Sequence, residues 1–229
     1  PAADLNGDDV SSKLKILSSL CFNSFLNNNI YVEGIKDIDK IDIDNANRLG
    51  YKIKLLGFAE LYNNKIYQRV HPTLIKKDSY VAGIDGVLNA VIIGGKPVGQ
   101  SIIQGEGAGA AATTSALVSD ISSILRGNVK FPFSLSSKER KKLIFDNIDE
   151  RFFSAYLRFE VIDKPGVLSN ITKFFTNNKV SIKRLVQTPD KNKKSSSIII
   201  ITHKSKNKFL KKVLKEVSKN NFIKRKSKL

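Results

Sequence analysis

Apolar side chains recur every three or four residues near the start of the chain, with polar side chains between them. This is the period of an α-helix with one buried face, and two aspartates stand where its first turn would begin. The pattern predicts a helix from Asp8 onward whose apolar face carries Val10, Leu14, Leu17, Cys21 and Phe25. The stretch over residues 110–125, closed by Gly127, predicts a second helix.

Shorter elements are predicted between these two helices. A strand, a helix and a longer strand come first, and an Asn-Asn turn then returns the chain antiparallel. The ranges are a strand near residues 30–35, a helix led by the turn at Asp42 to Asp44 and ended at Gly50, strands over Tyr51 to Glu60 and Ile66 to His71 about Asn63 and Asn64, and a strand pair about Gly94 and Gly95. Residues 1–127 are therefore predicted to form an α+β unit in which helices flank a mixed, largely antiparallel sheet.

After residue 150 the period changes to two. Apolar and polar side chains alternate from Phe153 to Val161, which is typical of a strand with one buried face. The elements that follow are a turn and helix over residues 163–175, a hairpin of Val180 to Gln187 with Ser196 to His203, an amphipathic helix over Phe209 to Val217, and a strand over Asn221 to Lys224. The order βαββαβ predicts a ferredoxin-like sandwich over residues 151–229. The serine-rich, charged segment around Pro132 predicts a linker over residues 128–150.

Composition narrows the class of protein. The 229 residues are 41% hydrophobic and 26% charged, which is typical of a globular chain. The longest apolar runs are far shorter than the ~20 residues needed to cross a bilayer, so we expect no membrane segment. The low cysteine content favours a protein of the reducing cytoplasm. Cys21 is the only cysteine, and His71 and His203 lack the spacing of a zinc site, so we expect neither an internal disulfide nor a metal.

The formal net charge of +18 is concentrated in the second half of the chain. Residues 1–150 hold 18 Lys and Arg against 17 Asp and Glu, whereas residues 151–229 hold 21 against 4. Such a charge favours RNA, but RNA-binding sheets of this shape expose stacking aromatics on their central strands. Residues 180–187 and 196–202 contain none. We therefore interpret the lysines as a solvated face, with RNA binding or a structural dimerisation module as alternatives.

The first candidate site lies in the opening residues. Asp9 and Lys13 are four positions apart on the predicted helix, so their side chains share a face, and Asp4 enters from the preceding loop. A lysine between carboxylates can exchange a proton with a hydroxyl or carbonyl group while the acids hold an ammonium group. The alternative is structural: Asp8 and Asp9 cap the helix, and Lys13 lies along its surface.

The second candidate is the glycine cluster of residues 105–109, placed after a strand and before a helix. The backbone there can approach a ligand closely, and the exposed N–H groups at the helix start favour an electron-rich group. The alternative is a glycine turn that only lets the helix pack against the strand, and it explains such a cluster about as often as ligand binding does. No acidic residue about twenty positions later supports a dinucleotide fingerprint.

Taken together, these segments resemble the homoserine dehydrogenase family. The resemblance is carried by ADLNGDDVSSK, LGYKIKLLGFAE, HPTLIKKDSYVAGIDGVLNAV and GEGAGAAATTSALVSDI, in that order, over residues 1–127. The stretch DKPGVLSNITKFFTNNKVSI is similar to the ACT regulatory domain that many members carry at the C-terminus. The resemblance implies an oxidoreductase that interconverts aspartate-4-semialdehyde and homoserine with NAD(P).

The resemblance also implies roles for individual residues. Lys13 matches the general acid/base, Asp9 the carboxylate that holds the substrate amino group, and Asp4 a further active-site acid. The loop that closes over the nicotinamide matches Gly105, Glu106, Gly107 and Gly109. The family's N-terminal Rossmann domain and a substrate-binding glutamate upstream of the opening motif have no match here. We therefore expect a fragment, with NAD(P) bound mainly by the missing domain.

In ACT domains a small amino acid binds beside the loop between the first strand and the first helix. That loop here is Asp163 to Asn170. The resemblance makes Gly166 the tight turn, the N–H groups of Val167 and Leu168 a carboxylate site, and Asp163 or Asn170 the partner of an ammonium or hydroxyl group. A turn without a ligand is the alternative. Threonine is the effector we expect, and a homodimer or homotetramer is the expected assembly.

Overall fold

The computed structural model describes residues 2–26, 30–128, 136, 138–190 and 194–225. The chain divides into two compact units, Pro1–Ile144 and Phe145–Leu229. Pro132, one of the residues that indicate the predicted linker over residues 128–150, lies outside the described residues.

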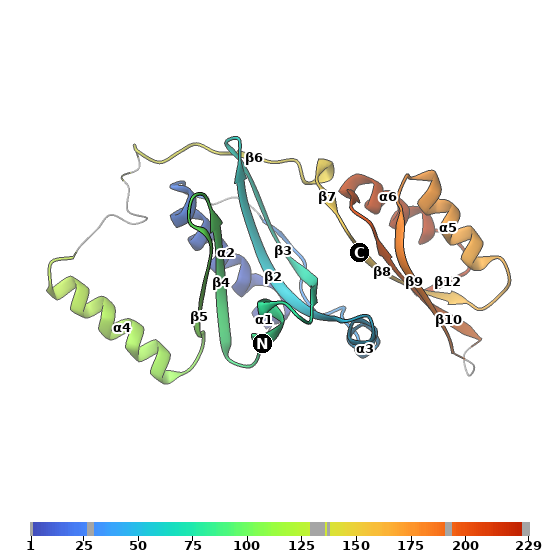
Figure 1. Cartoon of the computed structure of the whole chain (residues 1–229), viewed down its shortest axis with the longest axis horizontal. Helices are drawn as coiled ribbons and strands as arrows, with labels where there is room; N and C mark the ends of the chain where they lie inside the picture. The colour runs from blue at the N-terminus through green and yellow to red at the C-terminus, as the bar shows by residue number, and fades with distance from the viewer. Residues whose placement is uncertain (1, 27–29, 129–135, 137, 191–193, 226–229) are drawn as a thin grey trace. The chain divides into compact units, whose positions relative to one another are not determined.

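A long hairpin forms the centre of the first unit (Figure 1). Strands β2 (Tyr51–Tyr62) and β3 (Lys65–Lys76) pair antiparallel over their whole length. The two asparagines of the predicted turn, Asn63 and Asn64, have φ values of 47° and 59°, a region that asparagine tolerates better than most residues. Strand β1 (Tyr31–Val32) lies parallel to β3, and β6 (Ile144–Phe145) also pairs with β3. The predicted hairpin is confirmed.

Helix α2 (Asp8–Phe22) packs on this hairpin, as the apolar period predicts. Gly57 on β2 allows the approach, because a Cβ there would lie 3.2 Å from Val10 and 3.4 Å from Leu14. Two members of the predicted apolar face do not reach the core. Cys21 is exposed, and Phe25 lies beyond the end of the helix with 57% of its surface exposed.

Helix α3 (Lys40–Arg48) begins earlier than predicted. Its N-cap is Asp39, whose backbone N–H donates to the Asp42 carboxylate at 3.0 Å, and the two aspartates form a capping box. The prediction that Asp42 to Asp44 form the turn before the helix is therefore wrong, since both aspartates lie within it. The helix ends before Gly50, as predicted, and this glycine has a φ of 84°.

The rest of the first unit forms a second, separate sheet. Strands β4 (Leu88–Gly95) and β5 (Gly99–Glu106) pair antiparallel, and the turn lies at residues 96–98 rather than at Gly94 and Gly95. A 3-10 turn η1 (Tyr80–Gly83) precedes β4, and α4 (Ala110–Leu125) follows β5. The α+β class is confirmed, but the described strands form two sheets instead of the expected single one, and α4 buries none of its residues.

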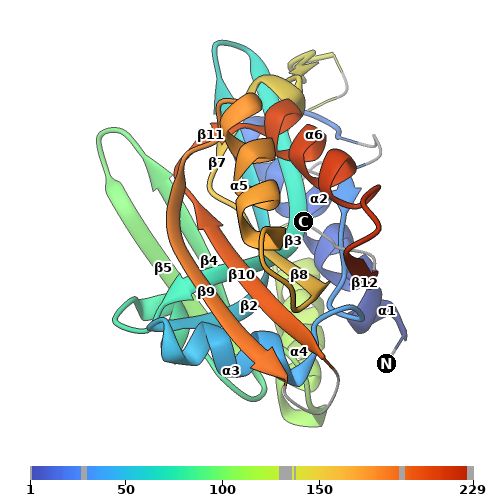
Figure 2. The ribbon, with the colours of Figure 1, turned by 90° about the vertical axis from the view of Figure 1, so that its right-hand side faces the viewer.

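The second unit has the predicted βαββαβ order. Its elements are β8 (Tyr156–Ile162), α5 (Val167–Asn177), β9 (Ile182–Asp190), β10 (Ser195–Thr202), α6 (Asn207–Val217) and β12 (Ile223–Arg225). The strands form an antiparallel sheet in the order β12-β8-β10-β9, and both helices lie on one face (Figure 2). Every second residue of β8 is buried in this core, where Phe159 meets Phe175 edge to face at 6.4 Å. The ferredoxin-like fold is confirmed.

Three short elements complete this unit. They are η3 (Ile148–Glu150) and the paired strands β7 (Phe152–Phe153) and β11 (Ser205–Lys206). Glu150 accepts hydrogen bonds from Lys206 at 2.7 Å and Lys208 at 2.6 Å, and Asp149 accepts one from Lys211 at 2.7 Å. Part of the positive charge of this half of the chain is therefore balanced within the unit.

Candidate functional site

Asp9 and Lys13 share one face of α2, as their spacing predicts. The Lys13 Nζ lies 2.8 Å from the Asp9 Oδ2, and the two side chains are 53% and 42% exposed. An exposed pair at this spacing stabilises a helix by only about 0.3–0.5 kcal/mol. The pair therefore contributes little to the stability of α2, and both groups remain open to a ligand.

Asp4 does not enter from a loop, as we expected, but lies on a short helix, α1 (Ala2–Asn6). Only Gly7 separates α1 from α2, and its φ of 86° makes the sharp turn between them. The Gly7 N–H donates to the Asp4 carbonyl oxygen at 3.2 Å, and the Gly7 carbonyl oxygen accepts from the Ser11 N–H at 3.0 Å. This turn places the segment with Asp4 directly before the turn with Asp9.

The end of β1 holds α1 in place. The Ile35 N–H donates to the Leu5 carbonyl oxygen at 2.8 Å, and the Glu33 N–H donates to the Val70 carbonyl oxygen of β3 at the same distance. These bonds join the sheet to α1 through backbone groups. The residues between β1 and α3 were not among the predicted site residues.

Side chains around Glu33 reinforce this connection. The Tyr31 hydroxyl donates to Glu33 Oε2 at 3.2 Å, and a guanidinium nitrogen of the buried Arg69 lies 3.8 Å from the same oxygen. The Arg69 guanidinium also lies over the Tyr31 ring, 4.8 Å from its centre. Burial and the neighbouring Glu33 charge raise the pKa of Tyr31, so its hydroxyl stays protonated and continues to donate.

The glycine cluster has two positions where a larger residue requires a change around it. Gly109 is the N-cap of α4 with a φ of 117°. A Cβ on Gly107 would lie 1.2 Å from the Asn89 side-chain nitrogen, so a larger residue there requires the exposed Asn89 amide to move. Gly105 meets neither condition, because nothing lies within 4 Å of its Cβ position.

The packing explanation for this cluster is not supported. It requires α4 to lie against a strand, yet α4 and β5, both described in full, contain no buried residue. The backbone of residues 105–109 is exposed together with Glu106. Asn89 was missed by the sequence reasoning, although it lies within one of the motifs that carry the family resemblance.

The loop before α5 has the predicted turn. Gly166 is the N-cap of α5 with a φ of 85°. The Val167 N–H already donates to the Lys164 carbonyl oxygen at a long 3.4 Å, so it is not free, contrary to our expectation. Val167 is buried and Leu168 half-buried, whereas Asp163 and Asn170 are exposed beside them. The arrangement presents polar groups at the start of a helix.

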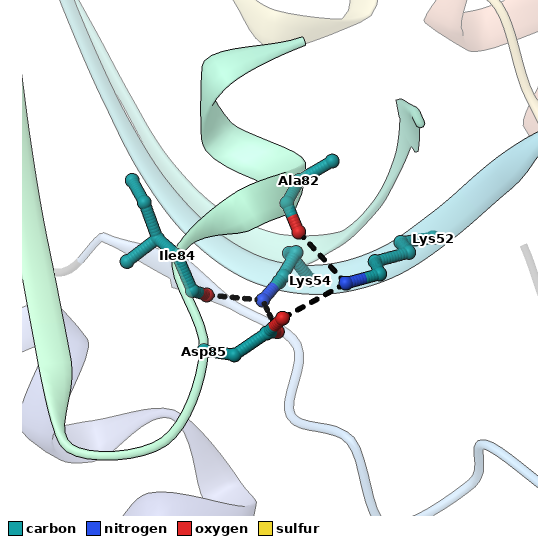
Figure 3. Close-up of polar contacts among 5 residues, drawn as sticks. All are labelled: Lys52, Lys54, Ala82, Ile84 and Asp85. Carbon is teal, nitrogen blue, oxygen red and sulfur yellow. Dashed lines mark hydrogen bonds and ion pairs between the residues drawn. The ribbon is translucent and has the colours of Figure 1, made fainter. Parts of the chain in front are cut away.

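A cluster of charged side chains lies outside the predicted sites. Lys52 and Lys54 on β2 both hold Asp85, which lies between η1 and β4 (Figure 3). Asp85 lies 33 positions from Lys52 and 31 from Lys54, so no local spacing predicts these contacts.

Two further observations concern ions and membranes. Among the described residues, no group of three or more His, Cys, Asp or Glu side chains is arranged to hold a metal ion. Within the same ranges, no helix combines the length and the apolar character that a membrane span requires.

Each of the two units contains a stretch of sequence that matches a known protein family. Residues 155–222 match the ACT domain, which places the protein in the class of chains where an ACT domain follows an α+β domain. Residues 1–122 match the family described as homoserine dehydrogenase. The chain belongs to the homoserine dehydrogenase family.

Individual relatives match nearly the whole of this chain but only about half of their own length. The chain is 35% identical over 223 residues to homoserine dehydrogenase of Neisseria gonorrhoeae, covering 93% of this chain and 51% of that protein. It is 34% identical to homoserine dehydrogenase of Helicobacter pylori, covering 95% and 51%. The crystal structure of a homoserine dehydrogenase from Thiobacillus denitrificans has a TM-score of 0.87 and 31% identity, covering 100% of this chain and 53% of that one. The chain spans about half the length of the relatives it matches.

Proposed function

We propose that this chain forms the substrate-binding, assembly and regulatory part of an enzyme that reversibly reduces aspartate-4-semialdehyde to homoserine with NAD(P)H. The observation that carries the proposal is the exposed Asp9–Lys13 pair on α2, directly after the turn that joins it to Asp4. In this proposal residues 1–127 bind the substrate, residues 128–150 form a linker, and residues 151–229 form the regulatory domain.

Lys13 is the proton-transfer group in this account. In the direction of reduction, its ammonium group donates a proton to the carbonyl oxygen of the aldehyde, which becomes the hydroxyl of homoserine. In the direction of oxidation, its neutral amine accepts that hydroxyl proton. The Asp9 carboxylate, 2.8 Å from Lys13 Nζ, holds the amino group of the substrate close to the reacting oxygen, and Asp4 provides a second carboxylate.

The glycine loop fits the nicotinamide end of NAD(P), which supplies or takes up the hydride when bound. Residues 105–109 present exposed backbone with one side chain longer than a methyl group, Glu106. The φ of 117° favours glycine at position 109, and the Asn89 amide lies beside the backbone of Gly107. The adenosine and pyrophosphate need another site, because in the described ranges no glycine-rich loop links a parallel strand to a helix.

The exposure of Lys13 also supports a cofactor-binding site in a separate nucleotide-binding domain. Proton transfer is most effective in a site that excludes water, and a side chain that is 53% exposed lacks such a site. A nucleotide-binding domain that carries the cofactor would cover this face when the substrate binds.

The ACT domain is the proposed effector site. Gly166, the start of α5 and the exposed Asp163 and Asn170 provide a turn, a helix N-terminus and polar side chains at one place. A carboxylate at the helix start and an ammonium group at the side chains describe a free amino acid. Threonine is the proposed effector, because homoserine is its precursor in the pathway the family serves.

The apolar surface of α4 supports a homodimer or homotetramer. Large aliphatic side chains on one side of this helix are more than half exposed: Leu117, Val118, Ile121, Ile124 and Leu125. The β4–β5 hairpin also exposes Ile92, Ile93, Ile102 and Ile103. Apolar side chains gathered in this way mark an interface, and a second copy of the chain carries the same surface.

A comparison of two preparations tests the proposed function. We expect homoserine-dependent reduction of NAD(P)⁺ by an enzyme that joins this chain to a nucleotide-binding domain, and none by residues 1–229 alone, because hydride transfer needs a positioned nicotinamide. Turnover by residues 1–229 alone would refute the proposed division of the site. Absence of turnover in the joined enzyme would refute the proposed activity.

A further inference from the structure

Two lysines of β2 clasp the loop that leads into β4. The Lys54 Nζ lies 2.6 Å from Asp85 Oδ1, and the Lys52 Nζ lies 2.9 Å from Asp85 Oδ2. Lys52 also donates to the Ala82 carbonyl oxygen at 2.9 Å, and Lys54 donates to the Ile84 carbonyl oxygen. Two ammonium groups therefore bind one carboxylate and two carbonyl groups of a single loop (Figure 3). We call these residues the lysine clasp.

The position of the lysines explains why both reach the same loop. Residues two apart on a strand point to the same side of a sheet, so Lys52 and Lys54 present their amines together. Hydrogen bonds from Lys54 and then Lys52 lower the pKa of Asp85 to about 2, so the carboxylate stays charged near neutral pH. Because Asp85 is 61% exposed, these ion pairs are screened by solvent and contribute little to global stability. What the ion pairs determine is the position of the loop that carries Asp85.

The loop in turn contacts the glycine cluster. The Leu88 N–H donates to the Asp85 carbonyl oxygen at 3.3 Å, and the Val87 carbonyl oxygen accepts from the Gly107 N–H at 2.9 Å. Leu88 is also opposite Glu106 in the β4–β5 register. Two residues after Val87, the Asn89 side chain fills the space beside Gly107. Asp85 is therefore linked to Gly107 through one short, hydrogen-bonded path.

The β4–β5 hairpin has little else to fix its position. In the part of the chain that the structure describes, the two strands form a sheet of their own, and every residue of β5 is exposed. An isolated two-stranded sheet is only marginally stable in water. The lysine clasp connects the hairpin to the larger sheet of β2 and β3.

We propose that Lys52 and Lys54 are positioning residues for the glycine loop, and that they set the distance of Gly107 from the nicotinamide by holding Asp85. This inference rests on the proposed function for its consequence in catalysis, but not for its structural step. The clasp acts at the cofactor side of the site, whereas Asp4, Asp9 and Lys13 act at the substrate side.

Hydrogen exchange in residues 1–229 tests the structural step. We expect Lys54→Met and Lys52→Met each to accelerate exchange of the Gly107 amide by about tenfold or more, with no change at Ile198–Ile200 in the second unit. Asp85→Asn, a smaller change at an exposed residue, is expected to act in the same direction. Lys54→Arg retains the ion pair, so the Gly107 amide of this variant is expected to exchange at nearly the rate of the unsubstituted chain. Lys65→Met, at an exposed lysine of β3, is the matched control.

Two results would overturn the proposal. One is an unchanged Gly107 exchange rate in the Lys54→Met and Asp85→Asn variants. The other is equal acceleration at Gly107 and at amides throughout the first unit, which would reduce the clasp to a contribution to overall stability.

Kinetics of the enzyme joined to a nucleotide-binding domain tests the catalytic step. Lys54→Met is expected to raise KM for the nicotinamide cofactor about tenfold and to leave KM for homoserine nearly unchanged, and Lys54→Arg is expected to restore the cofactor KM. An equal rise of both KM values, or no rise, would contradict a role on the cofactor side. If the unsubstituted enzyme shows no homoserine oxidation, the proposed function fails, and hydrogen exchange still decides the structural step.

Discussion

The backbone of Gly34 lies directly against the carbonyl group of Leu5. A Cβ on Gly34 would sit 2.1 Å from the Leu5 carbonyl oxygen and 2.7 Å from the Cα of Asn6. No side chain fits there unless the backbone moves, so glycine is required by space and not by its φ angle. Because Leu5 follows Asp4 on α1, this contact sets the position of a proposed substrate-binding carboxylate.

Gly34→Ala is expected to displace α1 from the end of β1. We predict a loss of about 1–3 kcal/mol in the free energy of unfolding, measured by urea denaturation, since the added methyl group meets backbone atoms. Exchange of the Ile35 amide, which donates to Leu5, is expected to accelerate. Gly94→Ala is the control, because nothing lies within 4 Å of its Cβ position. Equal stability of the two variants would contradict the contact.

The apolar surface of α4 gives a prediction about assembly. Leu117→Lys with Ile121→Lys is expected to weaken self-association by more than about tenfold, because two exposed aliphatic side chains on one face are replaced by charges. Analytical ultracentrifugation measures the change. Ser119→Lys, between them in sequence and on the opposite face of the helix, is the control. If the unsubstituted chain is a monomer at every concentration measured, this surface is not a self-association interface.

The spacing of apolar residues along the sequence made most elements predictable. Alternating apolar and polar residues predicted β8, whose buried residues alternate, and the helical periods after it completed the order of the second unit. The start of α3 was missed because capping depends on which aspartate accepts from the backbone, and the pattern does not distinguish Asp39 from Asp42.

Contacts between distant residues were the least predictable. The spacing of Asp9 and Lys13 placed them on one face of α2, since four residues make about one helical turn. The lysine clasp joins residues 52 and 54 to residue 85, and the fit of Asn89 beside Gly107 also depends on strand register. Such contacts follow from the folded sheet and leave no local pattern in the sequence.

His71 gives a prediction about pH. Burial, and to a smaller extent the positive charge of Arg69, lowers the pKa of His71 from 6.5 to about 4. The unfolded chain therefore binds a proton below pH 6.5 that the folded chain does not bind until about pH 4. Stability contributed by the neutral ring is present above pH 6.5 and is lost as the pH falls toward 4. The loss is at most about 3 kcal/mol.

Unfolding free energies at several pH values measure this effect. His71→Gln is expected to flatten the curve between pH 6.5 and pH 5. The lowered pKa values of Asp85 and Glu150, each about 2, act in the same direction but mainly at lower pH. An unchanged slope in the His71→Gln variant would show that another group causes the acid sensitivity.

The ACT domain gives a prediction about ligand binding. Threonine at millimolar concentration is expected to raise the melting temperature of residues 1–229 by a few degrees, because a ligand that binds only the folded state stabilises it. Gly166→Val is expected to abolish this shift and to cost about 1–2 kcal/mol by itself, since Gly166 has a φ of 85°. Ser169→Ala, at an exposed neighbour, should retain the shift. No shift with threonine, isoleucine, methionine or lysine would leave the second unit with a role in assembly alone.

The role of Lys13 is tested most directly by steady-state kinetics of the enzyme that joins this chain to a nucleotide-binding domain. Lys13→Ala is expected to lower kcat for homoserine oxidation by about two to four orders of magnitude, whereas Asp9→Ala is expected chiefly to raise KM for homoserine. Lys15→Ala, which removes the same charge from the same helix two residues away, is expected to leave kcat nearly unchanged. A Lys13→Ala enzyme with the kcat of the Lys15→Ala control would contradict the account and reduce Lys13 to a surface partner of Asp9.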